Sequence, residues 1–390
     1  MIDVAIIGAG PVGTLLAAEA ARHGVTAVGF ERRAEAGAGS RAVGVHATAL
    51  AAMEASGATE RVLATALRVR VGEARRGATS LGEVRFDRLR TRHPYVATLP
   101  QSATEAALTA TAAAWGAPSP RRGGAVRALV PRGDAVEVHV GHGDDVEVVV
   151  ARVVVVAGGL RARSLVPMPA RVRRYPDRYL MTDCADASDE GSRAIVHLDR
   201  DGVLESFPLP GDRRRYVAWM RTPADGGPAE ASSDADAERL RAAVARRSGS
   251  EAAAGAVEWA TSFGVARSRL TALRAGRILA IGDTAHEVSP IGGQGMNLGL
   301  IDAVTLAPLL GRWLREGEPP AALDRWESER LRAAARAGRI AAINTTLGRP
   351  ARTAGAAAVR VALHSPAARL LAHAYAMGFD PAAGRFRAPR

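Results

Sequence analysis

The sequence predicts an α/β fold in which a parallel sheet with flanking helices is interleaved with an antiparallel sheet and followed by C-terminal helices. Two short apolar runs, Val4–Ile7 and Val153–Val156, have the character of buried parallel strands. Residues 175–222 alternate apolar and polar side chains, as strands of an antiparallel sheet do. Apolar residues recur at helical spacing between 321 and 344. A chain of 390 residues favours two interlocked domains.

The first elements form a βαβ unit. Val4–Ile7 is a strand, Thr14–His23 is a helix closed by Gly24, and Val25–Phe30 is a second strand. The following segments read as an alanine-rich helical stretch, irregular strands, a helix and alternating strands, at residues 46–68, 69–98, 101–115 and 124–156.

The second half of the chain begins with the antiparallel sheet. One hairpin joins Val203–Leu209 to Arg215–Arg221 through a Pro-Gly-Asp turn. Ile278–Ile281 is a further short buried strand, and a long helix follows from about Gly293. Pro308 inside that helix should kink or split it, because proline lacks the N–H that the helix needs. The tail is alanine-rich and is expected to be helical in pieces.

Composition excludes several classes of protein. The net charge is +12, but all 52 basic residues are arginines scattered among 40 acidic ones, which favours a solvated surface over a nucleic-acid site. Cys184 is the single cysteine, so neither an intramolecular disulfide nor a thiolate zinc cluster is expected. No segment has the roughly 20 clean apolar residues of a membrane span or the pattern of a secretory leader. We expect a cytoplasmic protein with no nucleic-acid or membrane partner.

The first glycine-rich motif, Gly8-x-Gly10-Pro11-Val12-Gly13, stands between the first strand and helix. Its glycines allow a tight turn, close approach of a pyrophosphate and close helix–strand packing, and the helix N-terminus attracts phosphate. Glu31 lies at the end of the second strand, where its carboxylate can accept ribose hydroxyls and would repel a 2′-phosphate. FAD or NAD is therefore the expected ligand of this Rossmann-like unit.

Two further motifs lie near residue 290. A predicted strand delivers Asp283 to its C-terminal end, where a carboxylate can bind a ribityl hydroxyl. Glycines open the long helix, so its N-terminus can stabilise the negative charge of a reduced flavin. The strand with Asp283 is the second motif, and the third consists of Pro290, Gly293, Gly295, Met296 and Asn297.

In these motifs the chain resembles the para-hydroxybenzoate-hydroxylase-like family of FAD-dependent aromatic monooxygenases. The resemblance rests on Gly8–Gly13 with Glu31-Arg32, Ser40-Arg41-Ala42, Leu99-Pro100-Gln101, and Gly282-Asp283 through Asn297 with Asp302. It implies that Arg41 meets the FAD phosphates, that Gln101 and Asp283 contact the cofactor, that Val126 backbone lies near the adenine, and that Val43–Val45 run beside the flavin ring. Gly158-Gly159 departs from the Asp-Gly that the family usually shows.

The resemblance also implies an activity. NADPH or NADH would reduce FAD, O₂ would form a flavin C4a-hydroperoxide, and an aromatic or polycyclic substrate such as a secondary metabolite would be hydroxylated. The candidate catalytic residues are His46, Tyr216 and Pro290. Alternation along the 215–221 strand leaves open which sheet face meets the substrate. The substrate candidates are Val43, Val45, His197, Trp219 and Met220.

The expected domain organisation is discontinuous. Residues 1–70, 99–168 and 270–320 would form the FAD-binding domain, 71–98 and 169–269 the substrate domain, and 321–390 a helical region packed on the FAD domain. A flavin-dependent reductase or dehydrogenase without oxygen insertion is the alternative function. A flavin halogenase is disfavoured because the sequence holds no lysine. A basic nucleic-acid-binding protein rests on charge alone, and the oligomeric state is left open.

Overall fold

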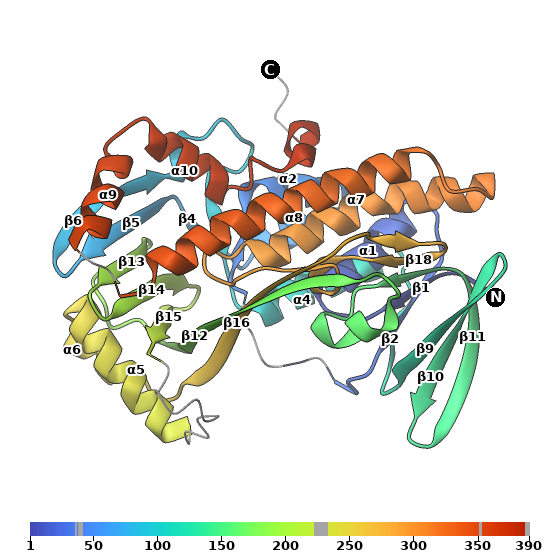
Figure 1. Ribbon diagram of the computed structural model, residues 1–390, viewed down its shortest axis with the longest axis horizontal. Helices are drawn as coiled ribbons and strands as arrows, with labels where there is room; N and C mark the ends of the chain where they lie inside the picture. The colour runs from blue at the N-terminus through green and yellow to red at the C-terminus, as the bar shows by residue number, and fades with distance from the viewer. Residues whose placement is uncertain (36, 38–41, 222–232, 351–352, 387–390) are drawn as a thin grey trace.

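A parallel sheet at one end of the molecule carries the N-terminal βαβ unit (Figure 1). The computed structural model describes residues 1–35, 37, 42–221, 233–350 and 353–386. The strand order is β17-β18-β11-β1-β2-β8, and β1 pairs in parallel with both β2 and β11. A hairpin of β9 and β10 continues from β11. The strands are β1 (Ile2–Ile7), β2 (Ala27–Glu31), β8 (Arg121–Arg122), β9 (Ala125–Arg132), β10 (Ala135–His142), β11 (Asp145–Val156), β17 (Arg274–Ala275) and β18 (Ile278–Ala280).

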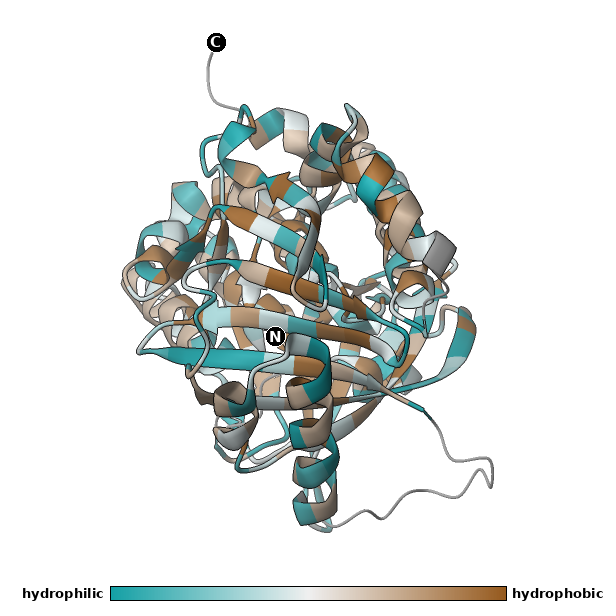
Figure 2. Ribbon diagram, turned by 90° about the vertical axis from the view of Figure 1, so that its left-hand side faces the viewer, coloured by the Kyte–Doolittle hydropathy of each residue, from teal (hydrophilic) through white to brown (hydrophobic). Residues whose placement is uncertain are grey.

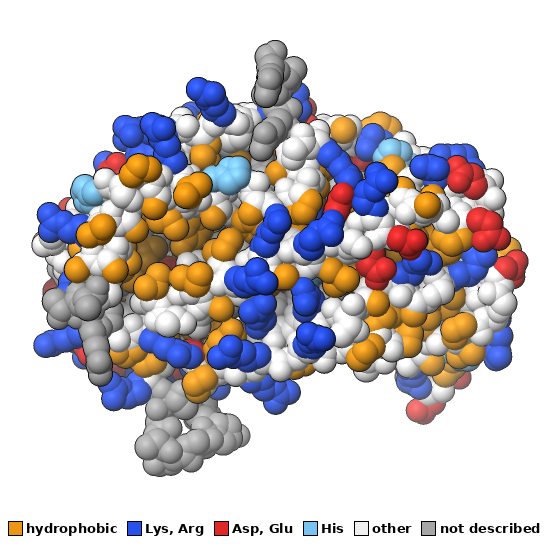
Figure 3. Space-filling view, turned by 45° about the horizontal axis from the view of Figure 1, so that its top comes forward, with side chains coloured by type: hydrophobic (Ala, Val, Ile, Leu, Met, Phe, Trp, Pro, Cys, Tyr) orange, Lys and Arg blue, Asp and Glu red, His pale blue; other side chains and the backbone are white. Residues whose placement is uncertain are grey.

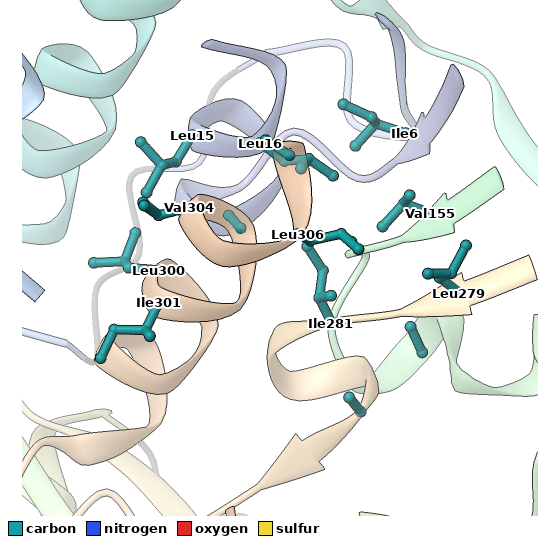
Figure 4. Packing of buried hydrophobic residues seen from close by; sticks show 14 of the residues in the cluster. Ile6, Leu15, Leu16, Val155, Leu279, Ile281, Leu300, Ile301, Val304 and Leu306 are labelled. Carbon is teal, nitrogen blue, oxygen red and sulfur yellow. The ribbon is translucent and has the colours of Figure 1, made fainter. Parts of the chain in front are cut away.

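Helices cover this sheet with their apolar faces. α1 (Pro11–Arg22) packs against α4 (Gln101–Ala114) and α7 (Gln294–Glu316). Figure 4 shows Leu306 of α7 beside Ile281 and Val155 at the sheet, so strand residues from three parts of the chain share one core with α7. The predicted βαβ unit and the buried strand at 153–156 are thus confirmed.

The second sheet is mainly antiparallel and has the order β19-β16-β12-β15-β14-β13-β5-β6. The predicted hairpin is present, with Leu209 facing Arg213 across the turn. Hydrophobic stretches run along these strands, and the helices beside them carry both hydrophobic and hydrophilic residues (Figure 2). Its strands are β5 (Val71–Arg76), β6 (Thr79–Arg85), β12 (Ala170–Ala185), β13 (Ala194–Asp199), β14 (Gly202–Leu209), β15 (Arg213–Met220), β16 (Thr261–Leu270) and β19 (His286–Glu287).

The two faces of this sheet have different neighbours. One face packs on α5 (Ser233–Ser248) and α6 (Glu251–Gly255) through a cluster that includes Tyr216. The opposite face forms a cluster that includes Trp219, Ile291 from the loop before α7, and Ala356 from α9 (Thr353–Leu363). We call the second one the front face. Because successive side chains of a strand alternate, neighbouring residues of β15 belong to opposite faces.

A small third sheet connects the two large ones. It has the order β3-β7-β4, formed by β3 (Gly44–Val45), β7 (Val96–Thr98) and β4 (Leu67–Val69). Thr98 Oγ1 donates a 2.7 Å hydrogen bond to the carbonyl oxygen of Pro208 at the end of β14. α2 (Ala47–Met53) and α3 (Ala58–Leu63) fill the predicted helical stretch between β3 and β4.

The C-terminal helices run across both sheets. α7 continues without interruption through Pro308, so the predicted split of this helix is wrong. Buried side chains on both sides of Pro308, including Leu306 and Leu310, hold the helix in the core. α8 (Ala322–Leu347) packs along α7, and α10 (Ala367–Tyr375) follows α9.

Arginines gather in the middle of the face shown in Figure 3. Cross-strand pairs of like charge, Arg171 with Arg269 and Arg173 with Arg267, lie on the β12–β16 ribbon. Burial and the nearby Arg267, Arg171 and Arg339 lower the pKa of Arg269. Among the described helices, none has the length and apolar character needed to cross a membrane.

Candidate functional site

The first glycine motif has the geometry of a close-packed phosphate turn. Gly8 has φ +107°, and a Cβ there would lie 2.5 Å from the Cα of Gly158. A Cβ on Gly13 would collide with the carbonyl oxygen of Gly8, so only glycine lets α1 approach β1 this closely. Gly10, at the N-cap of α1, has nothing within 4 Å of its Cβ position. That open space at a helix N-terminus is what a pyrophosphate requires.

Gly158 explains the departure from the usual Asp-Gly. A Cβ at this position would lie 2.6 Å from the Cβ of Ala162, and the Gly158 backbone contacts the Gly8 turn. Ala162 belongs to the 3₁₀ segment Leu160–Leu165. A carboxylate side chain is therefore sterically excluded here, because Ala162 occupies the space that it would need.

Glu31 ends β2 as the sequence predicts, and its carboxylate is already oriented. Oε2 accepts a 3.0 Å hydrogen bond from the backbone N–H of Ala9, and Oε1 accepts bonds of 3.0 Å from the N–H and Nε of Arg33. Burial opposes ionisation, but these hydrogen bonds outweigh it and lower the pKa of Glu31. The carboxylate is thus ionised beside the turn, with lone pairs left for ribose hydroxyls.

A buried ionic network fixes the loop that carries Asp283. Asp302 accepts hydrogen bonds from Gly282 N–H (3.0 Å), from His286 Nε2 (2.6 Å) and from Arg330 Nε (2.6 Å). Burial disfavours the charge of Asp302, yet His286 and Arg330 hold its pKa well below the usual range. His286 therefore has a structural role in this network.

Asp283 itself is exposed at the edge of this loop. Its Oδ1 lies 3.7 Å from the Cβ position of Gly295, so the second and third motifs meet. Arg163 donates to the carbonyl oxygens of Thr284 (2.9 Å) and Asp283 (2.7 Å) and holds the loop from outside.

The second glycine turn, Gly292-Gly293, opens α7 in a left-handed conformation. Gly292 has φ +93° and Gly293 φ +65°. Asn297 lies fully buried in the first turns of α7. Its Nδ2 donates to the carbonyl oxygens of Gly293 (2.8 Å) and Gly44 (2.9 Å), and its Oδ1 accepts from the N–H of His46 (2.8 Å). One side chain thereby ties the glycine turn to β3.

His46 and the C-terminal helix enclose this glycine turn. His46 Nε2 lies 3.3 Å from the Cβ position of Gly293, and Tyr375 Cε1 lies 3.3 Å from that of Gly292. The Tyr375 hydroxyl donates to Asn344 Oδ1 of α8 (3.0 Å). Burial lowers the pKa of His46 to about 4, so its imidazole is neutral at physiological pH. His46 Nδ1 is buried and has no hydrogen-bond partner among the described residues.

The front face of the antiparallel sheet lies next to the glycine turn through Ile291. Trp219 is on this face, with its Nε1 donating to Asp177 Oδ1 (2.8 Å). Tyr216 and Met220 pack in the cluster on α5, on the other side of the sheet. His197 also points to that side, because it pairs with Leu204. Of these four sequence candidates, only Trp219 is brought to the glycine turn.

The other predicted residues surround the two turns. Gln101 starts α4 and accepts a 3.4 Å hydrogen bond from Ala42 N–H. Val45 is buried in β3, Val43 is half-buried before it, and Pro290 and Met296 are half-buried at the start of α7. Val126 lies in β9. Arg32 is exposed, and Arg41 lies outside the described residues.

Sequence reasoning missed several functional candidates. Gln294 is 1 % exposed, yet neither atom of its amide has a partner within the described residues. Glu205 lies on the front face, and Tyr375 comes from a helix more than 70 residues beyond the glycine turn. The only signal available was the Gln inside the glycine motif; no pattern identified the others.

The Rossmann-type turn, the oriented Glu31 carboxylate and a second glycine turn that faces an antiparallel sheet define a flavoprotein. Its fold combines a parallel nucleotide-binding sheet with an antiparallel sheet. Glycines whose Cβ atoms would clash, open space at Gly10 and the unpartnered Gln294 amide all fit a bound dinucleotide. The chain belongs to the family described as FAD binding domain, whose model matches residues 1–341. FAD is its cofactor.

Curated relatives that align over most of this chain include monooxygenases. The chain is 34 % identical over 345 residues to a 12-dehydrotetracycline 5-monooxygenase/anhydrotetracycline 6-monooxygenase of Streptomyces rimosus, covering 84 % of this chain and 66 % of that protein. It is 32 % identical over 339 residues to a rifampicin monooxygenase of Streptomyces venezuelae, covering 85 % and 68 %. The chain thus spans just under two thirds of the tetracycline enzyme's length.

Solved structures agree on the fold. An anhydrotetracycline hydroxylase from Streptomyces rimosus superposes with a TM-score of 0.79 at 30 % identity, covering 97 % of this chain and 76 % of that one. A p-nitrophenol 4-monooxygenase from Pseudomonas putida gives 0.86 at 20 % identity, covering 97 % and 98 %, and shows the shared fold. The predicted α/β fold with an interleaved antiparallel sheet and C-terminal helices is confirmed.

Proposed function

We propose that the protein is an FAD-dependent monooxygenase that hydroxylates an aromatic or polycyclic substrate with NADPH or NADH and O₂. One observation carries the proposal: the Gly292-Gly293 turn meets the front face of the antiparallel sheet through Ile291, so a flavin at the turn would face that sheet. The named activities of the tetracycline and rifampicin relatives support a polycyclic secondary metabolite as the substrate.

The cofactor would be held by groups that the chain has already oriented. The α1 N-terminus at Gly10 would bind the pyrophosphate, Glu31 the ribose and Asp283 the ribityl chain. Gln101 and the Val126 backbone would contact FAD from α4 and β9. Bound FAD supplies the redox chemistry that activates O₂.

The protein would contribute a dry, positioned chamber. The α7 N-terminus, with its free N–H groups, would stabilise negative charge near Pro290 and Gly293. Neutral His46 presents an acceptor nitrogen beside the same turn and is our candidate to orient a hydroxyl of the substrate. Trp219 and Val45 would form apolar walls. The position of Tyr216, Met220 and His197 on the α5 side does not support substrate roles for them.

Purification followed by an absorbance spectrum is the first test. We expect a flavin spectrum, NADPH or NADH oxidation that a substrate accelerates, and a product heavier by ~16 Da, the mass of one oxygen atom. Oxidation with no oxygenated product would favour the reductase or dehydrogenase alternative.

A second candidate function is cyclisation, in which the product has the same mass as the substrate. A solved structure described as a Diels–Alderase of pyrroindomycin biosynthesis superposes with a TM-score of 0.80 at 25 % identity, covering 97 % of this chain and 80 % of that one. A product isomeric with its substrate, formed without NADPH or NADH, would support a cyclase and contradict the monooxygenase.

We also propose a cytoplasmic location, no nucleic-acid partner, and the discontinuous division described above. In that division the ranges 1–70, 99–168 and 270–320 bind FAD, while 71–98 and 169–269 bind substrate. Strands of the parallel sheet between residues 2 and 156 and at 274–280 support it. Limited proteolysis with and without FAD tests the division, because the cofactor should protect the first set of ranges together.

A further inference from the structure

Glu205 is a buried carboxyl on the front face of the antiparallel sheet. It lies in the middle of β14 and pairs with Val196 of β13 and Val217 of β15. Both neighbours belong to the front-face cluster with Ile291, so the Glu205 side chain points to the same side as the glycine turn. Only 6 % of the residue is exposed.

Within the described residues, no hydrogen bond or ion pair offsets the burial of the Glu205 carboxyl. Glu205 makes neither a hydrogen bond nor an ion pair there, whereas the similarly buried Glu190 binds His197 and Arg214 on the other side of the sheet. A buried polar group without a partner costs roughly 1–3 kcal/mol, and more when it is charged. Such a residue needs a reason other than stability, and contact with a ligand is one such reason.

Its surroundings converge on the glycine turn. Glu205 is close enough to Tyr179 of β12 and to Tyr375 of α10 to raise the pKa of each phenol further than burial does. Tyr375 in turn contacts the Cβ position of Gly292. The Tyr179 hydroxyl is buried and has no partner among the described residues. Figure 3 shows hydrophobic side chains around a hollow at the side where Figure 1 draws α9 and this sheet.

We propose that the Glu205 carboxyl is the polar anchor of the substrate site and donates a hydrogen bond to a carbonyl or phenolic oxygen of the aromatic substrate. The carboxyl is a donor only while protonated, and burial raises its pKa to about 8. Val196 and Val217 beside it are apolar, and Tyr179 and Tyr375 are neutral. The charged groups near Tyr179, Arg349 and Asp177, form a 2.8 Å ion pair with each other, and burial alone shifts the pKa of Glu205. The anchor therefore works at neutral pH and fails above about pH 8. This inference rests on the proposed function for the location of the substrate.

Ligand binding to the FAD-loaded protein tests the anchor. The probes are 2-naphthol and naphthalene, which differ by one hydroxyl, and flavin absorbance reports binding. We expect 2-naphthol to bind more tightly, and Glu205→Leu to weaken 2-naphthol about tenfold, the value of one buried hydrogen bond, while leaving naphthalene unchanged. Glu205→Gln keeps a donor, so it should retain the preference and lose its decline above pH 8.

Thr182→Val is the matched control. Thr182 is fully buried on β12, its hydroxyl lacks a partner among the described residues, and it pairs with Tyr216 on the α5 side. Its replacement should leave both affinities unchanged. Glu205→Leu should also unfold at a higher temperature than wild type at pH 9, because it removes a carboxyl that must ionise while buried. A purely structural residue would not combine a gain in stability with a loss of binding.

The proposal is wrong if wild type does not distinguish 2-naphthol from naphthalene, or if Glu205→Leu binds both as wild type does. Equal weakening of both probes would also overturn it, since that would indicate a damaged site. Failure of the monooxygenase is separate: a protein that yields no oxygenated product but binds 2-naphthol through Glu205 refutes the activity and leaves the anchor standing.

Discussion

Replacement of Arg330 by methionine should be among the most damaging single substitutions in this protein. Arg330 is 1 % exposed on α8 and donates to Asp302 (2.6 Å), to both carboxylate oxygens of Asp380 (2.8 Å each) and to the Leu298 carbonyl oxygen (3.2 Å). Methionine fills part of the space but leaves two carboxylates buried without their cation. Breaking a buried pair from one side costs about 3–5 kcal/mol, a large part of the roughly 5–15 kcal/mol that holds a protein folded.

Urea unfolding at pH 7 with saturating FAD measures this loss. The control is Arg332→Met on the same helix, because Arg332 is exposed and forms no ion pair with the described residues. Its effect should stay within about 0.5 kcal/mol.

The deficit of Arg330→Met should also depend on pH. In wild type the lowered pKa of Asp302 contributes stability above the unfolded pKa of 3.8, and that contribution is lost as pH falls through the lower folded value. Without Arg330 the part of this contribution that comes from the guanidinium is absent, while the His286 and Gly282 hydrogen bonds remain, so the difference between variant and wild type should shrink only as the pH is lowered below 3.8. A loss below about 1 kcal/mol, or one equal to that of Arg332→Met, would refute the network's role.

Further predictions follow from the glycine turns and helices. Gly10→Ala should fold normally, since its Cβ meets nothing within 4 Å, but should lose FAD in a flavin-release assay, whereas Gly13→Ala should destabilise the apoprotein itself; equal FAD affinity of Gly10→Ala and wild type would contradict this. Gly292→Ala should weaken FAD binding, because the residue has φ +93° and the new Cβ would lie 2.7 Å from Asn344 Nδ2. An FAD titration that gives the wild-type affinity would contradict this. Pro308→Ala should raise the free energy of unfolding by about 1–2 kcal/mol by restoring a helical N–H, and a decrease would show that the proline is needed. A gel-shift assay at physiological salt should show no nucleic-acid complex, and a salt-sensitive shift would indicate an arginine-dependent partner.

The sequence determined the cofactor half of the site because that half is local. Gly8, Gly10 and Gly13 are held by one turn, and Glu31 follows at the end of the next strand, so spacing alone conveys the geometry. The second glycine motif is equally compact. Its link to β3 through Asn297 spans about 250 residues, and only the family resemblance suggested that the two segments meet.

Pro308 and Gly158 show where local rules were overridden. A proline inside a helix predicts a break, but the buried contacts on both sides of Pro308 keep α7 whole. The missing carboxylate at Gly158 was visible in the sequence. The reason was not visible, because Ala162 and the carbonyl group of Ile7, from two other elements, fill the space that a side chain at 158 would need.

The substrate half was decided by tertiary structure alone. Alternation along β15 divides Trp219 from Tyr216 and Met220, but period-two patterns are symmetric and do not say which face meets the flavin. That choice was made when α5 covered one face and Ile291 with the C-terminal helices covered the other. Glu205 and Tyr375 carry no motif and meet only because β14 and α10 fold onto the same turn. The sequence by itself thus determined a flavoprotein and its phosphate turn, while the chamber that selects the substrate was set by long-range packing.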